Sequence, residues 1–211
     1  MTTTLYCHCL MGVPGSGKST LAQQWLALDP SLVVIAPDAI RDELYGDPII
    51  QGDWEAVNAE VRRQFQGAIQ AHRSVIYDAT NVKRSWRRDL IGAYPQLQWL
   101  GWILLTPVKI CLERNQQRDR QVPLDVIIDY AQLLNQQPPR LEDGFAALYE
   151  VPLREVDHTV DWPQFQAQIQ DLPQMTSSSP SPASILRTDQ SSLGEGQRRQ
   201  EWRESGWTGG T

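Results

Sequence analysis

Residues 12–20 have the composition and spacing of a site for nucleotide phosphates. The segment reads GVPGSGKST and fits the G-x-x-x-x-G-K-[ST] pattern of a phosphate-binding P-loop. Glycines allow the backbone to wrap closely around a phosphate, while inward-pointing N–H groups and the dipole of a following helix favour its negative charge. We therefore expect a nucleoside triphosphate to bind at Gly15, Ser16, Gly17, Lys18, Ser19 and Thr20.

Two side chains of this segment carry the expected chemistry. Lys18 is expected to act in catalysis by reaching the β- and γ-phosphates, and the Ser19 hydroxyl is expected to hold Mg²⁺. An apolar, strand-like stretch at 5–11 precedes the loop, and a helical pattern with Leu21, Trp25 and Leu28 on one face follows it. This context supports a P-loop over the alternative, a glycine-rich turn with a solvated lysine.

Asp38 and Arg41 follow a second apolar segment, residues 32–36. They lie three positions apart, so they share one face of the helical turn that we expect there. A carboxylate at this place can accept a proton from an attacking hydroxyl group, and Arg41 can hold an anionic group of the acceptor. Alternatively, Asp38 caps the helix. The neighbouring P-loop favours a catalytic Asp38 and a substrate-binding role for both residues.

A third apolar segment, residues 74–78, ends in Asp78. An acidic residue after such a strand is typical of the carboxylate that supports Mg²⁺ and its waters in P-loop enzymes, which makes Asp78 a metal-site candidate together with Ser19. A turn-forming aspartate is the alternative. Asn81, which follows shortly after, is either a structural turn residue or a substrate contact.

A fourth apolar segment, residues 98–105, leads into a helix that carries Arg114 and Arg118 four positions apart. Thr106 is expected to cap this helix. Paired arginines on such a helix can close over a triphosphate and neutralise charge on the transferring phosphoryl group, so both are candidates for nucleotide binding and Arg118 for catalysis. Ion pairing with Glu113 and Asp119 on a surface helix is the alternative.

The chain alternates apolar strand segments with helical patterns. A fifth strand is expected at about 148–156, and Pro152 places it at an edge of the sheet. Helical spacing recurs at 54–68 and again at 124–134, behind Pro123. The sequence thus predicts an α/β P-loop NTPase fold with a five-stranded, mostly parallel sheet, helices on both faces and a helical lid.

A change of composition near residue 173 divides the chain. We expect a P-loop kinase domain over 1–173 and a disordered tail over 174–211, which is rich in Ser, Gly, Gln and Pro and has little to bury. The tail also contains Trp202 and Trp207 among charged residues, so a short docking element is the alternative. Its partner is not indicated by the sequence.

The net charge of −6 argues against a protein that coats nucleic acid electrostatically, but not against one that grips the end of a strand. Basic residues cluster in three places, each of which is also compatible with a solvated helix face: Arg62, Arg63 and Arg73; Lys83, Arg84, Arg87 and Arg88; Arg114, Arg118 and Arg120.

Location is indicated by hydropathy and cysteine usage. The chain has no apolar run of 18 residues and no signal-peptide pattern, so we expect a cytoplasmic protein that does not contact a membrane. Cys7, Cys9 and Cys111 are expected to be buried thiols of a reducing compartment rather than zinc ligands.

Over roughly residues 5–157 the order of these motifs resembles the P-loop polynucleotide kinase family, a branch of the P-loop kinases. The residues that carry the resemblance are 12–20, Asp38-Ala39-Ile40-Arg41, Asp78-Ala79-Thr80-Asn81, and Arg114-Asn115-Gln116-Gln117-Arg118 followed by Val122-Pro123; Glu142-Asp143-Gly144-Phe145 is also similar to that group.

The resemblance implies phosphorylation of the 5′-hydroxyl end of a nucleic acid. By position, Asp38 would be the general base and Arg41 the contact to the acceptor's phosphate. Arg114 and Arg118 would be lid arginines on the donor phosphates, and Asp78 the acidic residue after the third strand.

We therefore expect a kinase that uses ATP and Mg²⁺ and transfers the γ-phosphoryl group to a hydroxyl, most readily the 5′-hydroxyl of a polynucleotide. A kinase of a small-molecule hydroxyl acceptor is the first alternative. A regulatory protein that binds ATP, or hydrolyses it slowly, is the second.

Overall fold

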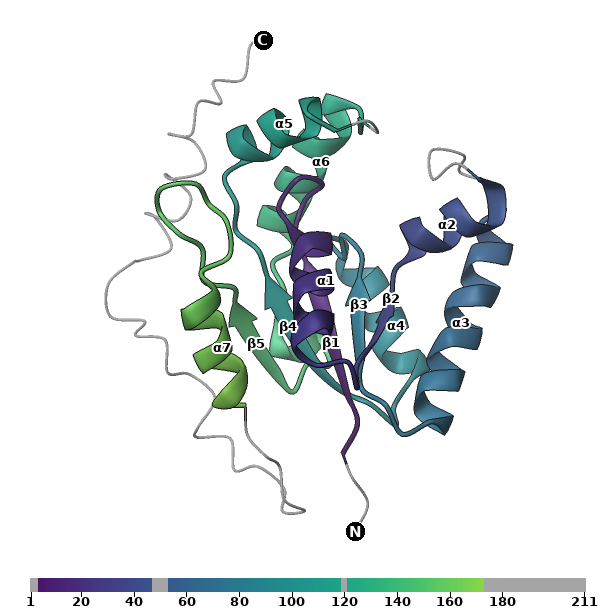
Figure 1. Ribbon diagram of the computed structural model, residues 1–211. Coiled ribbons are helices and arrows are strands. Elements are labelled where there is room, and N and C mark those ends of the chain that lie inside the picture. The colour runs from purple at the N-terminus through teal and green to yellow at the C-terminus, as the bar shows by residue number, and fades with distance from the viewer. Residues whose placement is uncertain (1–3, 47–52, 119–120, 173–211) are drawn as a thin grey trace.

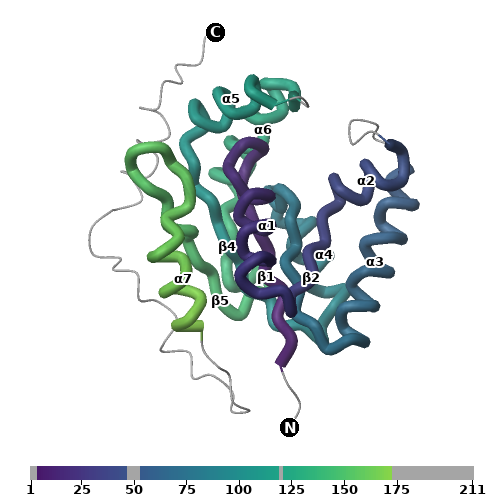
Figure 2. The backbone as a smooth tube through the Cα atoms, in the orientation of Figure 1, coloured from purple at the N-terminus to yellow at the C-terminus, as the bar shows by residue number. Residues whose placement is uncertain are grey.

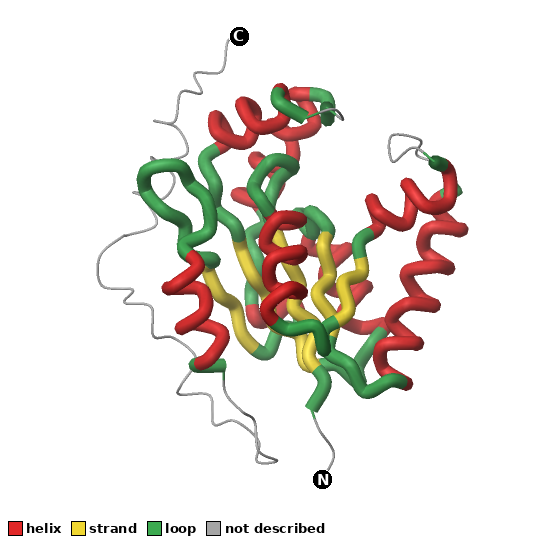
Figure 3. Tube along the Cα trace, in the orientation of Figure 1, coloured by secondary structure: helices red, strands yellow, loops and turns green. Residues whose placement is uncertain are grey.

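The computed structural model describes residues 4–46, 53–118 and 121–172. In these residues a five-stranded sheet lies between helices (Figures 1 and 3). The strands are β1 (Tyr6–Met11), β2 (Val33–Ile35), β3 (Val75–Asp78), β4 (Gln98–Ile103) and β5 (Ala147–Glu150). Their order is β2-β3-β1-β4-β5 and every neighbouring pair is parallel, which confirms the predicted α/β sheet and makes it parallel throughout.

The helices alternate with the strands along the chain (Figure 2). They are α1 (Lys18–Leu28), α2 (Pro37–Tyr45), α3 (Trp54–Gln70), α4 (Arg84–Ala93), α5 (Val108–Gln116), α6 (Leu124–Gln136), the short 3-10 helix η1 (Leu141–Asp143) and α7 (Trp162–Gln170). The predicted helical patterns at 54–68 and 124–134 correspond to α3 and α6, and Pro123 occupies the N-cap position of α6.

Alternation along β1 directs side chains into two separate cores. Cys7, Cys9 and Met11 pack on the face that α3 covers, whereas Leu10 packs on the face that α1 and α7 cover. Both cysteines are buried free thiols, as predicted, and burial raises the pKa of Cys9 to about 12. The central strand is therefore apolar on both sides, which is why the sheet has helices on both faces.

Two details differ from the sequence prediction. The last strand ends at Glu150 rather than continuing to 156, because Pro152 cannot donate to a ladder; the chain instead forms an isolated antiparallel bridge between Leu153 and Val160. Leu28, expected on the same face of α1 as Leu21 and Trp25, is the last residue of the helix and is 49% exposed.

The ion pair between Arg87 of α4 and Asp143 of η1 is fully buried, at a distance of 2.9 Å between Nη2 and the carboxylate. Arg87 also donates to the carbonyl oxygens of Asn81, Val82 and Gln137. One guanidinium therefore joins the segment after β3 to the residue that follows α6 and to η1, the short helix that precedes β5. Arg87 thus has a structural position, and the predicted basic cluster at Lys83–Arg88 is not a continuous surface patch.

The positions of several predicted features lie outside the described residues: Asp119, Arg120 and the tail at 174–211 with Trp202 and Trp207. None of the helices in the described ranges combines the length and apolarity that a membrane span requires.

Arg87→Met should lower the free energy of unfolding by about 3–5 kcal/mol, because it leaves the Asp143 carboxylate buried without this partner. Arg88→Met, on the exposed neighbour in the same helix, should change it by about 0.5 kcal/mol or less. Urea denaturation followed by circular dichroism measures both values. Equal stability of the two variants would show that the buried pair does not hold these segments together.

Candidate active site

The predicted site residues converge beyond the carboxyl ends of the parallel strands, where open α/β sheets bind ligands. The P-loop connects β1 to α1, Asp38 lies in the first turn of α2 after β2, and Asp78 ends β3. Figure 1 shows the start of α1 and the helices α2 and α5 around this edge. The topology thus brings together four segments that are far apart in the sequence.

The P-loop backbone is fixed by close packing at Gly15. This residue has a φ of +88°, and a Cβ added to it would lie 2.4 Å from the carbonyl oxygen of Cys111 in α5. Both features require glycine. The tight contact places α5 directly against the loop, which explains how a helix that begins almost a hundred residues later reaches the phosphate site.

Lys18 is buried at the start of α1. Its ammonium group donates to the carbonyl oxygen of Val13 at 2.9 Å and to the Ser16 hydroxyl at 3.4 Å, so it lies within the curve of the loop. Burial lowers the pKa of Lys18 to about 8, and the Asp78 carboxylate opposes this shift. A phosphate in the loop would bring further negative charge to this buried ammonium and favour its charged form.

Thr106 has a role that differs from the predicted helix cap. The N-cap position of α5 is Pro107, and the Thr106 hydroxyl instead donates to the carbonyl oxygen of Ser16 at 2.8 Å. A threonine three residues after β4 therefore bonds to the P-loop from the side. The only indication of this role in the sequence is that a polar residue directly follows the apolar segment 98–105.

Ser19 and Asp78 provide oxygen ligands of the kind that Mg²⁺ prefers. Burial raises the pKa of Asp78 above its usual value, while the Lys18 ammonium and a hydrogen bond from the Ser19 side chain oppose the shift. This hydrogen bond brings together the two residues predicted to hold the ion. Elsewhere in the described ranges, no group of three or more His, Cys, Asp or Glu residues forms an alternative metal site.

Asp38 and Arg41 form an ion pair across one turn of α2, on the shared face that their spacing predicted. The N-cap position of α2 is Ala36 and no side chain caps the helix, so Asp38 does not act as the cap that was its alternative role. Its charge acts on both Lys18 and Asp78. The carboxylate therefore belongs to the same electrostatic site as the P-loop.

Arg114 lies beside the P-loop and bonds to main-chain carbonyl oxygens. Its guanidinium donates to the carbonyl oxygen of Gly15 at 3.3 Å and to those of Asp157 and His158 at 2.9 and 3.0 Å. It thus joins α5, the loop and the segment before α7. A triphosphate in the loop would lie within reach of this side chain.

Arg118 is not on the helix that carries Arg114, contrary to the prediction, because α5 ends at Gln116. It lies in the exposed turn that follows, where its charge still acts on Lys18 and Asp78.

Asn115 explains the position of this turn. Its buried side-chain amide accepts from the backbone N–H of Val122 at 2.9 Å and donates to the carbonyl oxygen of Val122 at 2.8 Å. These two bonds close the loop between α5 and α6, so Asn115 positions the segment that holds Arg118. The sequence shows the spacing of Asn115 and Val122, but it does not reveal the two hydrogen bonds between them.

Asn81 has a structural role, which decides between its two predicted alternatives. It has a φ of +51°, is buried, and donates from Nδ2 to the carbonyl oxygen of Leu10 at 2.7 Å. The adjacent Thr80 carbonyl accepts from the N–H of Gly12 at 3.1 Å. The segment after β3 is therefore bonded to the start of the P-loop.

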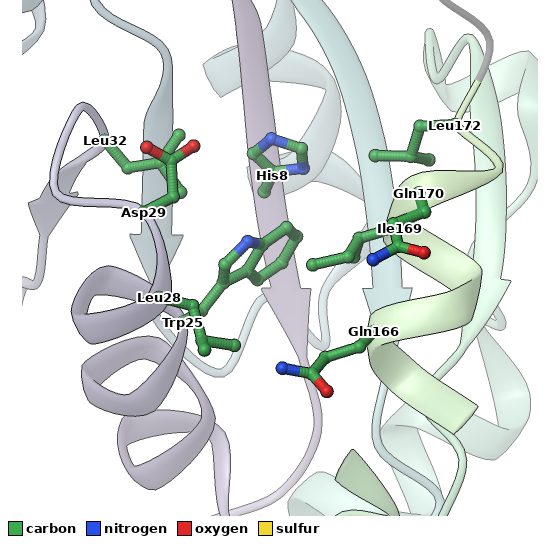
Figure 4. A pocket seen from close by; sticks show the side chains of 9 residues that line it. All are labelled: His8, Trp25, Leu28, Asp29, Leu32, Gln166, Ile169, Gln170 and Leu172. Carbon is green, nitrogen blue, oxygen red and sulfur yellow. The ribbon is translucent and has the colours of Figure 1, made fainter. Parts of the chain in front are cut away.

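A separate pocket of about 370 Å³ lies between α1 and α7, toward the end of the sheet opposite the candidate site (Figure 4). Its lining includes His8, Trp25 and Asp29. His8 accepts a hydrogen bond from Trp102 Nε1 at 3.2 Å, and burial lowers its pKa to about 3. Because this pocket lies toward the amino ends of the strands, it is not part of the candidate site.

Comparison with solved structures places this architecture among P-loop kinases. A chain of the Pnkp1/Rnl/Hen1 RNA repair complex is similar, with a TM-score of 0.60 and 22% identity over 65% of this chain and 46% of that one. A fungal RNA kinase has a TM-score of 0.60 at 15% identity over 99% of this chain and 51% of its own. A sugar kinase from Janibacter sp. HTCC2649 has a TM-score of 0.55 at 18% identity over 79% of this chain and 93% of its own.

This chain spans about half the length of the RNA repair chain and the RNA kinase that it matches. At these identities the likeness shows the shared P-loop kinase fold. No curated protein matches the chain. A family model described as an AAA domain matches residues 8–139, which include the P-loop, Asp38, Asp78 and Arg118. The chain therefore belongs to the AAA_33 family of P-loop kinase-like AAA domains.

Proposed function

We propose that this protein is a kinase that uses ATP and Mg²⁺ to phosphorylate the 5′-hydroxyl end of a polynucleotide. The observation that carries the proposal is the Asp38–Arg41 pair, which lies at the strand ends, where the charge of Asp38 acts on Lys18 and Asp78. A protein that only binds or hydrolyses ATP needs the P-loop but has no use for a carboxylate and a guanidinium on the acceptor side.

The donor half of the site would bind the triphosphate along the P-loop. Lys18 exchanges its bonds to the loop for the β- and γ-phosphates, and Arg114 and Arg118 neutralise charge on the transferring group from the side of α5. Ser19 and Asp78 would hold Mg²⁺, which supplies charge neutralisation at the phosphate oxygens.

The acceptor half would orient and deprotonate the attacking hydroxyl. Asp38 accepts the proton as the hydroxyl oxygen bonds to the γ-phosphorus, and the bond from that phosphorus to the bridging oxygen of ADP breaks. Arg41 holds the phosphate that follows the terminal nucleoside and keeps the Asp38 carboxylate on the same face of α2.

Three similar structures bear on the acceptor. The RNA repair complex and the fungal RNA kinase are named for RNA and share the fold at a TM-score of 0.60. The sugar kinase at 0.55 supports the alternative of a small-molecule acceptor. Arg41 favours the first, because a guanidinium beside the base is suited to an acceptor that already carries a phosphate.

Transfer of labelled γ-phosphate from ATP tests the proposal directly. The acceptors are 5′-hydroxyl DNA and RNA oligonucleotides, each compared with its 5′-phosphorylated form and with a pool of small hydroxyl metabolites. Label on the 5′-hydroxyl oligonucleotides alone is the expected result. Label only in the metabolite pool would indicate a small-molecule kinase with the same mechanism. Free phosphate as the sole product would indicate a regulatory ATPase.

Asp38→Asn should lower kcat/KM for phosphoryl transfer by about 10²–10⁴-fold, because the amide cannot take the hydroxyl proton. The dissociation constant for ATP should change by less than about twofold, since the donor contacts remain. Asp42→Asn, on an exposed acid of the same helix, is the matched control and should keep the parent rate. Transfer at the parent rate by Asp38→Asn would rule out Asp38 as the base.

Nucleotide affinity should fall as pH rises above about 8. Phosphate binding favours the charged form of Lys18, whose pKa in the free protein is about 8, so above this pH binding requires proton uptake and the dissociation constant rises about tenfold per pH unit. Below it the affinity should be nearly constant.

Titration with a non-hydrolysable ATP analogue from pH 7 to 10 measures this profile. Lys18→Met should bind weakly with no such rise, whereas Lys109→Met, on the exposed surface of α5, should follow the parent. A rise of the same size in Lys18→Met would assign the titration to another group.

A further inference from the structure

We propose that Trp54 is a stacking platform for the base of the acceptor's terminal nucleotide, and that the acceptor side binds this one nucleotide rather than a length of strand. The inference rests on the proposed polynucleotide kinase function and specifies what its acceptor side recognises. Trp54 is the first residue of α3, which packs against α2, the helix of Asp38 and Arg41.

Trp54 has the exposure and the partner of such a platform. Half of the residue is exposed, at 51%, and the Cζ atom of Arg41 lies 5.2 Å from the centroid of its ring. The guanidinium lies over one face of the indole, and we assign the other face of this half-exposed residue to a planar base. The same guanidinium bonds to Asp38, so one side chain connects the platform to the reacting hydroxyl.

The Arg41 side chain gives a second indication that a ligand binds beside Trp54. Its side chain is only 14% exposed, and within the described part of the chain its Nε is a buried donor without a hydrogen-bond partner. A buried N–H group without an acceptor is unfavourable. A phosphate oxygen on the 3′ side of the terminal nucleoside would supply that acceptor while its base lies on Trp54.

Within the described residues, three of the four cationic side chains of the cluster after β3 are engaged inside the protein, so this cluster is not a continuous track for further phosphates. Of the cluster after β3, Arg87 is buried against Asp143 and Arg84 binds the same carboxylate at 2.6 Å. Lys83 lies over the ring of Trp86, 4.3 Å from its centroid. These charges are already committed to partners within the protein.

The surface beside the platform is acidic. Asp42 and Glu43 on α2 and Glu55 on α3 are exposed and would repel an extended phosphate backbone. We therefore assign the affinity mainly to one stacked base and one phosphate. It follows that a dinucleotide should bind as well as a long oligonucleotide, with a salt dependence of roughly one phosphate contact, a slope of log affinity on log salt of about −0.7.

Calorimetric titration of the full chain without ATP tests this inference. The probes are the 5′-hydroxyl dinucleotide dT-dT, the same dinucleotide with an abasic 5′ residue, and a longer 5′-hydroxyl oligothymidylate. Trp54→Ala should weaken binding of dT-dT by about tenfold or more, the loss expected for one base stack, and leave binding of the abasic probe unchanged. Trp54→Phe should retain most of the affinity because it keeps an aromatic face.

Trp86→Ala is the matched control, since Trp86 is also exposed and also lies under a cation but is on α4. It should bind dT-dT like the parent. The inference is overturned if Trp54→Ala binds dT-dT as the parent does, if Trp86→Ala loses as much, or if the oligothymidylate binds far more tightly than dT-dT with a steeper salt slope.

The phosphoryl-transfer assay separates this inference from the proposed function. Base-dependent binding that requires Trp54, without label on any oligonucleotide, would refute the kinase proposal and leave the platform in place. Efficient labelling of dT-dT by both the parent and Trp54→Ala at equal KM would refute the platform and leave the kinase in place.

Discussion

The site depends on the junction between the end of β1 and the segment that follows β3. The N–H of Gly12 donates to Thr80, and the Asn81 amide donates to Leu10, so the start of the P-loop is bonded across to the strand that supplies Asp78. Without these bonds the start of the loop would lack its link to the segment after β3. With them, Lys18 of the P-loop and the Asp78 carboxylate are fixed relative to each other by main-chain geometry.

That junction is in turn supported by a buried charge. Arg87 donates to the carbonyl oxygen of Asn81, and Asp143 neutralises it. Burial alone would raise the pKa of Asp143, but hydrogen bonds from Arg84 and Arg87 outweigh it and hold the pKa below its usual value. A cation in the interior is stable only with such a partner, so the approach to β5 contributes to a site that lies two strands away.

Local patterns in the sequence predicted the elements and the residues at their ends. The P-loop, the five strands and the Asp38–Arg41 face follow from motif spacing and periodicity, which are properties of neighbouring residues. The prediction failed where a polar side chain bonds to a distant backbone. Thr106 reaches Ser16 across 90 positions and Arg87 reaches Asp143 across 56, and no local pattern distinguishes these partners from a cap or a solvated surface. The end of α5 before Arg118 was missed because the pairing of Asn115 with Val122 closes the loop from the side.

His8 makes the face that carries α1 sensitive to acid. The unfolded chain takes up a proton at this imidazole near its usual pKa of 6.5, whereas the folded chain does so only near 3, because burial against Trp25 and Trp102 disfavours the charge. The unfolded state therefore binds more protons between these values, and the folded state loses stability as the pH falls through this range. Since His8 lies on the central strand and packs against Trp25 of α1, protonation of its imidazole would weaken the packing between this helix and the sheet.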